Sequence, residues 1–227
     1  STDYRKLKDM IESYKDYNKE NCKVFCVKHS YPKLIQHGIQ PFMCVILDPR
    51  PITGISTHGV KRKDLFKTID NKTLFLVASM TDPSVTKHLK KKANILGWSA
   101  YSEALRDTDI TDKIKLHKDT GIDEGETLVS GGTCAAMRTI SLAHILGFRK
   151  FELFGFDCSI PKVTKKMEKE ISNGKPKYFK VETNGEYFWT TGELLAMAQD
   201  CEKLFDNKEV DMSININGTN TLVSEVF

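Results

Sequence analysis

Four short polar segments of this sequence contain the side chains that could bind an anion or move a proton. Each follows an apolar run, and they are residues 28–30 (Lys-His-Ser), 48–50 (Asp-Pro-Arg), 130–133 (Ser-Gly-Gly-Thr) and 155–159 (Gly-Phe-Asp-Cys-Ser). A carboxylate can orient or deprotonate a hydroxyl group, and an arginine can neutralise a phosphate. Glycines let backbone N–H groups approach an anion closely. These residue types together indicate a site for a phosphorylated ligand.

The glycine pair is the first phosphate-binding candidate. Gly131 and Gly132 would expose their amides, and Ser130 and Thr133 could each add a hydroxyl donor. The helix expected to follow would direct its positive end at the same place. No lysine follows the glycines, so the segment is not a P-loop, and it does not match GxGxxG. A tight turn in which Thr133 caps the helix explains the same residues equally well.

Two aspartates after apolar runs, Asp48 and Asp157, could face one pocket. There, one carboxylate could accept a proton from a second substrate, hold a ribose hydroxyl or bind a metal ion. Each could instead cap a helix. Arg50 could neutralise a phosphate or be a surface charge of a loop, and His29 could line the pocket. We therefore take Asp48 and Asp157 as the catalytic candidates, and Arg50 and His29 as binding candidates.

The elements that would position these residues alternate along the chain. Apolar runs with little alternation predict strands that are covered on both faces, at residues 23–27, 42–47, 74–78, 95–98, 128–129, 151–154 and 212–216. Helices are expected at 32–37, 82–92, 134–146 and 191–205. This alternation predicts an α/β fold with a Rossmann-like, doubly wound, mostly parallel sheet flanked by helices. Ligands of such sheets bind at the carboxyl ends of strands.

The length of 227 residues fits a single α/β domain over residues 1–227, and we expect both ends to be cut from something longer. Residues 102–126 and 159–186 are polar or lysine-rich, which predicts two surface insertions, the second an irregular flap. Residues 128–154 are expected to form a strand–helix–strand unit of one parallel sheet.

Composition excludes several classes of protein. The net charge of +4 is spread out rather than gathered in a basic stripe, which argues against a nucleic-acid partner. No apolar run reaches the roughly 20 residues of a membrane span. The six cysteines complete no zinc set and fit reduced thiols of a cytoplasmic protein. Cys134 could be a stabilised thiolate in a first helical turn, although a filler role is favoured.

Three blocks of the sequence resemble the MptE-like family, which includes archaeal 6-hydroxymethylpterin diphosphokinases and the central domain of motility-associated flagellin glycosyltransferases. The first block is VFCV at 24–27, LIQHGIQP at 34–41 and VILDP at 45–49. The second is SGGT at 130–133, AHILG at 143–147 and FGFD at 154–157, which is also similar to bacterial sialyltransferases that use CMP-sugars. The third is NGT at 217–219.

The resemblance implies a Rossmann-like nucleotide-binding fold in which Gly131, Gly132 and Thr133 hold phosphate or sugar while Asp48 and Asp157 line the same cleft. Our first hypothesis is a nucleotide-dependent transferase, a glycosyltransferase-like enzyme with a nucleotide sugar as donor. The second is a Mg²⁺-dependent diphosphokinase that acts on a small alcohol such as a hydroxymethylpterin. The third is a non-catalytic module that binds nucleotide or sugar, because the histidine of the sialyltransferases and a second aspartate of the diphosphokinases are missing.

Overall fold

The computed structural model describes residues 7–9, 11, 22–56, 59–69, 71–101, 128–132, 134–173, 177–207, 210–218 and 221–226. The chain divides into two compact units, which we call the sheet unit, Ser13–Ser130, and the C-terminal unit, Ser1–Glu12 with Gly131–Phe227. We describe each unit by itself. The single domain expected over residues 1–227 stays a prediction, and the insertion expected at residues 102–126 lies outside the described residues.

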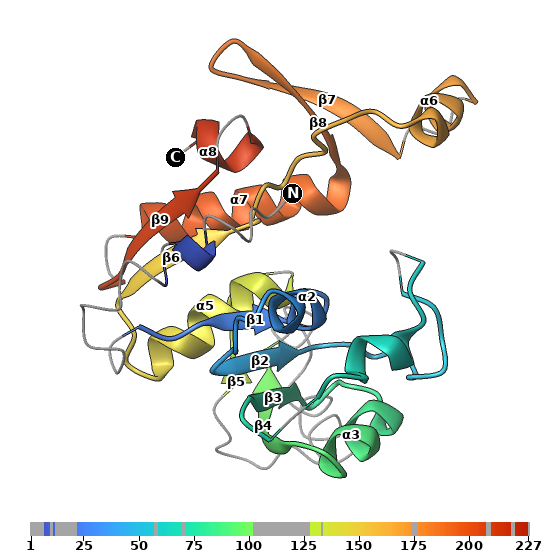
Figure 1. The fold of residues 1–227 in the computed structure, drawn as a ribbon. Helices are drawn as coiled ribbons and strands as arrows, with labels where there is room; N and C mark the ends of the chain where they lie inside the picture. The colour runs from blue at the N-terminus through green and yellow to red at the C-terminus, as the bar shows by residue number, and fades with distance from the viewer. Residues whose placement is uncertain are drawn as a thin grey trace, which may run out of the picture. The chain divides into compact units, whose positions relative to one another are not determined.

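The sheet unit is built on five parallel strands in chain order, β1-β2-β3-β4-β5 (Figure 1). The strands are β1 Phe25–Val27, β2 Met43–Ile46, β3 Leu74–Ala78, β4 Asn94–Ala100 and β5 Leu128–Val129. They are joined by helices α2 Tyr31–Gln36 and α3 Pro83–Lys90 and by the 3₁₀ helix η1 Arg62–Phe66. Because β1, β2 and β3 are neighbours, the residues that follow them meet at one edge of the sheet.

Burial and helix capping follow the sequence pattern in this unit. All four residues of β2 are buried, as expected for a strand covered on both faces. Tyr31 of α2 packs edge-on against Phe75 of β3, with ring centroids 5.1 Å apart. Asp82 caps α3 by accepting a hydrogen bond from the Ser84 amide at 2.8 Å, and Pro83 occupies the first turn.

Within its described residues, the C-terminal unit combines helices with two two-stranded sheets (Figure 1). Its elements are α5 Ala135–Ile145, β6 Lys150–Phe154, α6 Lys165–Ser172, β7 Tyr178–Thr183, β8 Glu186–Thr191, α7 Gly192–Asp206, β9 Ser213–Asn217 and α8 Leu222–Val226. Strands β6 and β9 pair in parallel, and β7 and β8 form an antiparallel hairpin. Met137, Ile140, Cys201 and Val223 belong to its buried core.

The irregular flap expected at residues 159–186 is wrong, because this stretch contains α6, β7 and the start of β8. Asn184 and Gly185 form the hairpin turn, and both have positive φ angles, of 50° and 80°. An Asn-Gly pair between two strands is a strong hairpin signal, since both residues tolerate this conformation. We predicted an irregular flap because the stretch is rich in lysine, and we did not use the Asn-Gly signal.

The strand–helix–strand unit expected at residues 128–154 has its two strands in different sheets. β5 pairs with β4, whereas β6 pairs with β9. The local pattern predicted the elements correctly, but pairing depends on the distant strand β9. The fold class is confirmed as a Rossmann-like α/β fold with a mostly parallel sheet and flanking helices. Within the described part of the chain, no helix is both long and apolar enough to cross a membrane.

Candidate functional site

Asp48 is the centre of a charged cluster at the carboxyl edge of the sheet unit. It lies two residues after β2 and is 1% exposed. Its Oδ2 atom accepts a hydrogen bond from Lys28 Nζ, and its Oδ1 atom accepts one from Arg50 Nε at 2.8 Å. Arg62 Nε lies 3.8 Å from Oδ2. Lys28, Arg50, Arg62 and Asp48 form what we call the basic cluster.

The strand order explains why these residues meet. Lys28 follows β1 directly, and its neighbour β2 leads into Asp48. Arg50 then turns back toward Asp48 after Pro49, and its amide lies 3.3 Å from Asp48 Oδ1. Arg62 opens η1 and donates a hydrogen bond to the Pro51 carbonyl at 3.1 Å. The cluster is therefore held by the sheet on one side and by the 50–62 loop on the other.

The cluster has more positive than negative charge. Among the described residues, Asp48 is the one carboxylate paired with any of its three cations. Burial by itself would raise the pKa of Asp48, but the hydrogen bonds from Lys28 and Arg50 outweigh burial and hold that pKa below its ordinary value. Burial lowers the pKa of Lys28, and the charges of Arg50 and Arg62 lower it further against the opposing effect of Asp48.

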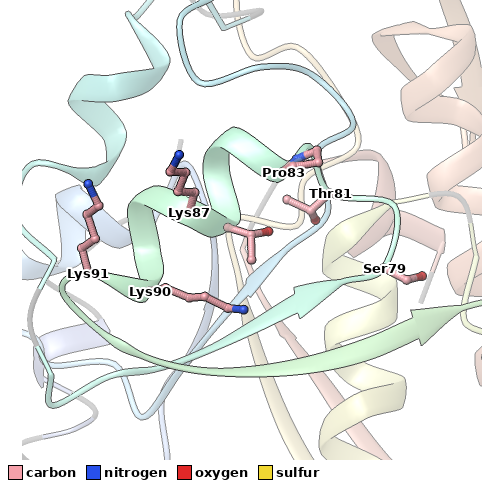
Figure 2. A pocket seen from close by; sticks show the side chains of 7 residues that line it. Ser79, Thr81, Pro83, Lys87, Lys90 and Lys91 are labelled. Atoms are coloured by element: carbon pink, nitrogen blue, oxygen red, sulfur yellow. The ribbon is translucent and has the colours of Figure 1, made fainter. Parts of the chain in front are cut away.

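An open hollow of about 660 Å³ begins beside this edge and is lined by residues that follow β3 and by residues of α3 (Figure 2). Ser79 and Thr81 follow β3, and the next residue, Asp82, donates its amide to the Asp48 carbonyl at 3.0 Å. The remaining lining residues are Pro83, Thr86, Lys87, Lys90 and Lys91. In Figure 2, Lys87 and Lys91 extend to one side of α3 and Lys90 to the other. The hollow thus adds a lysine-rich surface to the same unit.

The glycine pair has a different environment in the C-terminal unit. Gly131 and Gly132 have φ angles of 128° and 81°, which favour glycine. A Cβ atom on Gly131 would lie 2.1 Å from Ser141 Oγ, and one on Gly132 would lie 2.8 Å from Asp200 Oδ2. Close packing against α5 and α7 therefore accounts for both glycines. A carboxylate beside Gly132 also disfavours an anion there, so their phosphate-binding role stays a prediction.

Cys134, not Thr133, is the N-cap of α5, with its Sγ atom 3.5 Å from the Met137 amide. The expectation that Thr133 caps the helix is therefore wrong. Burial raises the pKa of the Cys134 thiol above its ordinary value, and this outweighs the hydrogen bonds from the Met137 and Ala136 amides. Cys134 thus caps α5, and its raised pKa argues against the activated thiolate that the sequence left open.

The other candidates are spread over the two units. His29 is half-buried in the turn after β1, in which the Ser30 amide donates to the Val27 carbonyl. Ser130 is exposed after β5 and ends the sheet unit. Asp157 belongs to the C-terminal unit, where its Oδ1 atom would lie 3.9 Å from a Cβ atom on Gly218. Thr133 lies outside the described residues. The pocket expected to hold both Asp48 and Asp157 stays a prediction.

Sequence reasoning selected neither Lys28, which it named only as part of the 28–30 segment, nor Arg62 as a site residue. Lys28 had a usable signal, since it follows a buried strand directly and belongs to the same polar segment as His29. Arg62 had none, because it lies between Lys61 and Lys63 in a polar stretch that is typical of a solvated surface. It is nevertheless 3% exposed.

Comparison with known proteins adds one finding. The family model described as 6-hydroxymethylpterin diphosphokinase MptE-like matches residues 6–163, which is more than half of the chain and includes Lys28, Asp48, Arg50 and Arg62. No curated protein matches the chain, and no solved structure does. The matched range contains all five strands of the parallel sheet and the charged residues at its carboxyl edge. The chain therefore belongs to the 6-hydroxymethylpterin diphosphokinase MptE-like family.

Proposed function

We propose that this protein is a nucleotide-dependent transferase whose basic cluster binds the phosphate groups of the donor. The observation that carries the proposal is the meeting of three cations on one buried carboxylate at the carboxyl ends of β1 and β2. Ligands of open α/β sheets bind at this edge. The positive charge of the cluster suits a phosphorylated donor, because arginine and lysine are the usual side chains that bind phosphate.

The family name favours diphosphate transfer as the reaction. In that reaction the hydroxyl oxygen of a small alcohol attacks the β-phosphorus of ATP, and the bond from this phosphorus to the oxygen that bridges to the α-phosphate breaks. The products are AMP and the diphosphorylated alcohol, and the hydroxyl proton passes to a base or to water. Cations held around the transferred phosphates would stabilise the charge of the transition state.

Within this proposal the four residues have different roles. Arg50 has a side chain that is 45% exposed, so it can contact the donor directly. Asp48 is enclosed by its cations and has a lowered pKa, which suits a residue that positions cations and not one that removes a proton. Asp157 belongs to the C-terminal unit, and the acceptor role expected for it from the sequence stays a prediction. The lysine-rich hollow along α3 would take the rest of an anionic substrate.

Asp48 is a poor fit for Mg²⁺. Both of its oxygen atoms accept hydrogen bonds from Lys28 or Arg50, and Arg62 adds a third positive charge nearby. A divalent ion prefers carboxylates without competing cations. Among the described residues, no group of three or more histidine, cysteine, aspartate or glutamate side chains could hold a metal ion. The proposal therefore gives Asp48 no metal-binding role.

Calorimetric titration of the full chain with a panel of nucleotides tests the proposal. The panel contains ATP, CMP, CDP, UDP, GDP and CMP- and UDP-sugars, each with and without Mg²⁺. We expect ATP to bind, and we expect Arg50→Gln to weaken that binding while Lys67→Gln, an exposed lysine paired with Asp64, leaves it unchanged. The second sequence block resembles sialyltransferases that use CMP-sugars. A preference for a nucleotide sugar over ATP would therefore replace diphosphate transfer by glycosyl transfer as the proposed reaction. Nucleotide binding without turnover would leave the non-catalytic module, and binding of no nucleotide at all would contradict both reactions.

A further inference from the structure

The charge of the basic cluster is not balanced within the described residues. The cluster contains three positively charged side chains, of Lys28, Arg50 and Arg62, and one negatively charged side chain, of Asp48. If all four groups are ionised, two positive charges remain. Two of the cations are buried, since Lys28 is 7% and Arg62 is 3% exposed. Buried charges are unfavourable unless they are paired, so the cluster lacks about two negative charges.

Arg62 gives a second and independent sign of a missing anion. Among the residues that the structure describes, its buried Nε atom has no hydrogen-bond partner, and the Asp48 Oδ2 atom lies 3.8 Å from it. This separation is too long for a hydrogen bond. A buried donor without an acceptor is rare in folded proteins and calls for an explanation such as an ion that belongs there. Each Asp48 oxygen atom already accepts a hydrogen bond, Oδ2 from Lys28 and Oδ1 from Arg50.

We propose that the basic cluster is a site for one doubly charged phosphate group, which is a phosphomonoester or the terminal phosphate of a polyphosphate, and that it discriminates against phosphodiesters. This inference rests on the proposed function and deepens it by naming the ionic form of the ligand. A phosphate dianion matches the excess of two positive charges, whereas a phosphodiester carries one negative charge. The dianion would approach from the side of the half-exposed Arg50 and would also accept a hydrogen bond from Arg62 Nε.

The phosphate group has a defined place in the reaction proposed above. In ATP the γ-phosphate is the terminal group and the β-phosphorus is the atom attacked. Placing the γ-phosphate in the cluster would leave the β-phosphorus next to it and free for attack by the acceptor. The phosphate of a CMP-sugar is a diester and would leave one charge of the cluster unbalanced.

Methyl phosphate and dimethyl phosphate are matched probes for this inference, because they differ by one methyl group and one charge. Binding of each is followed at pH 7.5 by chemical-shift titration of the full chain. We expect methyl phosphate to bind at least about tenfold more tightly, a factor that corresponds to one modest charge interaction. Arg50→Gln reduces the excess to one charge, so we expect weaker methyl phosphate binding and a smaller preference. Lys67→Gln removes one charge elsewhere in the same unit and should change neither quantity.

The outcomes separate this inference from the proposed function. Equal affinity for the two probes, or a preference that Arg50→Gln leaves unchanged, would overturn the inference even if ATP is turned over. A preference that depends on Arg50 in a protein that binds no nucleotide would support the inference and contradict the proposed function. Circular dichroism of Arg50→Gln confirms that the variant is folded, which is expected because the Arg50 side chain is half-exposed.

Discussion

Two regions of this protein were expected to bind phosphate, and the structure gives them opposite electrostatic surroundings. Asp48 in the sheet unit is surrounded by Lys28, Arg50 and Arg62. Gly132 in the C-terminal unit lies close to the carboxylate of Asp200. Both regions follow a strand, and the glycine pair resembles known anion cradles more closely in sequence. The comparison teaches that backbone amides alone do not define such a site, because the charge of nearby side chains decides which ion is stable there.

The two regions also use their unusual residues in different ways. The glycines have positive φ angles and allow the turn to pack closely against Ser141 of α5 and Asp200 of α7, so their role here is one of local packing. Three charged residues of the basic cluster are buried, namely Lys28, Asp48 and Arg62, and burial of charge is costly for stability. A costly arrangement of this kind is more typical of function than of folding.

Removal of the central carboxylate should have the largest effect. Asp48→Asn keeps the side-chain volume but leaves two buried cations without a negative partner. We expect the free energy of unfolding to fall by about 3 kcal/mol or more, as for other buried pairs that lose one partner. Urea denaturation measures this change. The control Asp64→Asn breaks a pair in which Lys67 is 70% exposed, and it should change stability far less than Asp48→Asn does.

A methyl group in the glycine turn should have the next largest effect. Gly131→Ala forces a positive φ angle on alanine and places a Cβ atom 2.1 Å from Ser141 Oγ, unless Ser141 moves. We expect a loss of about 2–3 kcal/mol in urea denaturation. Gly97→Ala in β4 is the control, because a Cβ atom there meets nothing within 4 Å, and it should not destabilise. If the folded Gly131→Ala protein lost phosphate binding and kept its stability, the turn and not the cluster would be the site.

The pH dependence of stability provides a smaller test of the basic cluster. Folding lowers the pKa of Lys28 below the ordinary 10.5, mainly through burial. Between the two pKa values the unfolded chain binds more protons than the folded protein, so the contribution of Lys28 to stability rises with pH toward 10.5. Below the folded pKa both states are protonated and this contribution does not change. Urea denaturation of the protein and of Lys28→Met at several alkaline pH values should show that the variant lacks the rise. An equal rise in both would contradict an unbalanced charge at Lys28.

The smallest expected effect is on thiol reactivity. This test concerns the glycine turn because Cys134 lies directly after it. Burial raises the pKa of Cys134, and it raises the pKa of Cys158 and Cys201 to about 12. We expect iodoacetamide at pH 7.5 to modify the exposed Cys22 first and to leave these three thiols unmodified in the native protein. Peptide mass spectrometry locates the label. Rapid modification of Cys134 would indicate that the start of α5 stabilises a negative charge after all.

Much of the fold could be predicted from the sequence because local signals determine it. The unbroken apolar runs at 42–47 and 74–78 indicated buried strands, and Asp82-Pro83 indicated the start of α3. The pairing of β6 with β9 could not be predicted, since it joins segments about 60 residues apart. The β7–β8 hairpin was not predicted because its segment is rich in lysine, although the Asn184-Gly185 turn is a hairpin signal.

The site was only partly predictable for a related reason. Asp48 and Arg50 follow a strand and have residue types that suit phosphate chemistry, so position and chemistry both pointed to them. Arg62 is brought to the cluster by the fold of the 50–62 loop, which no local pattern encodes. The carboxylate of Asp200 beside Gly132 likewise depends on packing between distant segments. Net charge around a residue is a property of the fold, and on that ground we propose the basic cluster, and not the glycine pair, as the phosphate site.

Hydrogen–deuterium exchange of the full chain with and without inorganic pyrophosphate tests the central claim most directly. Bound phosphate should order the segment that carries Asp48 and Arg62, so the account predicts slower amide exchange in residues 48–62. Exchange in residues 131–138 should stay unchanged. Slower exchange in residues 131–138, with residues 48–62 unaffected, would contradict the account and place the anion at the glycine turn.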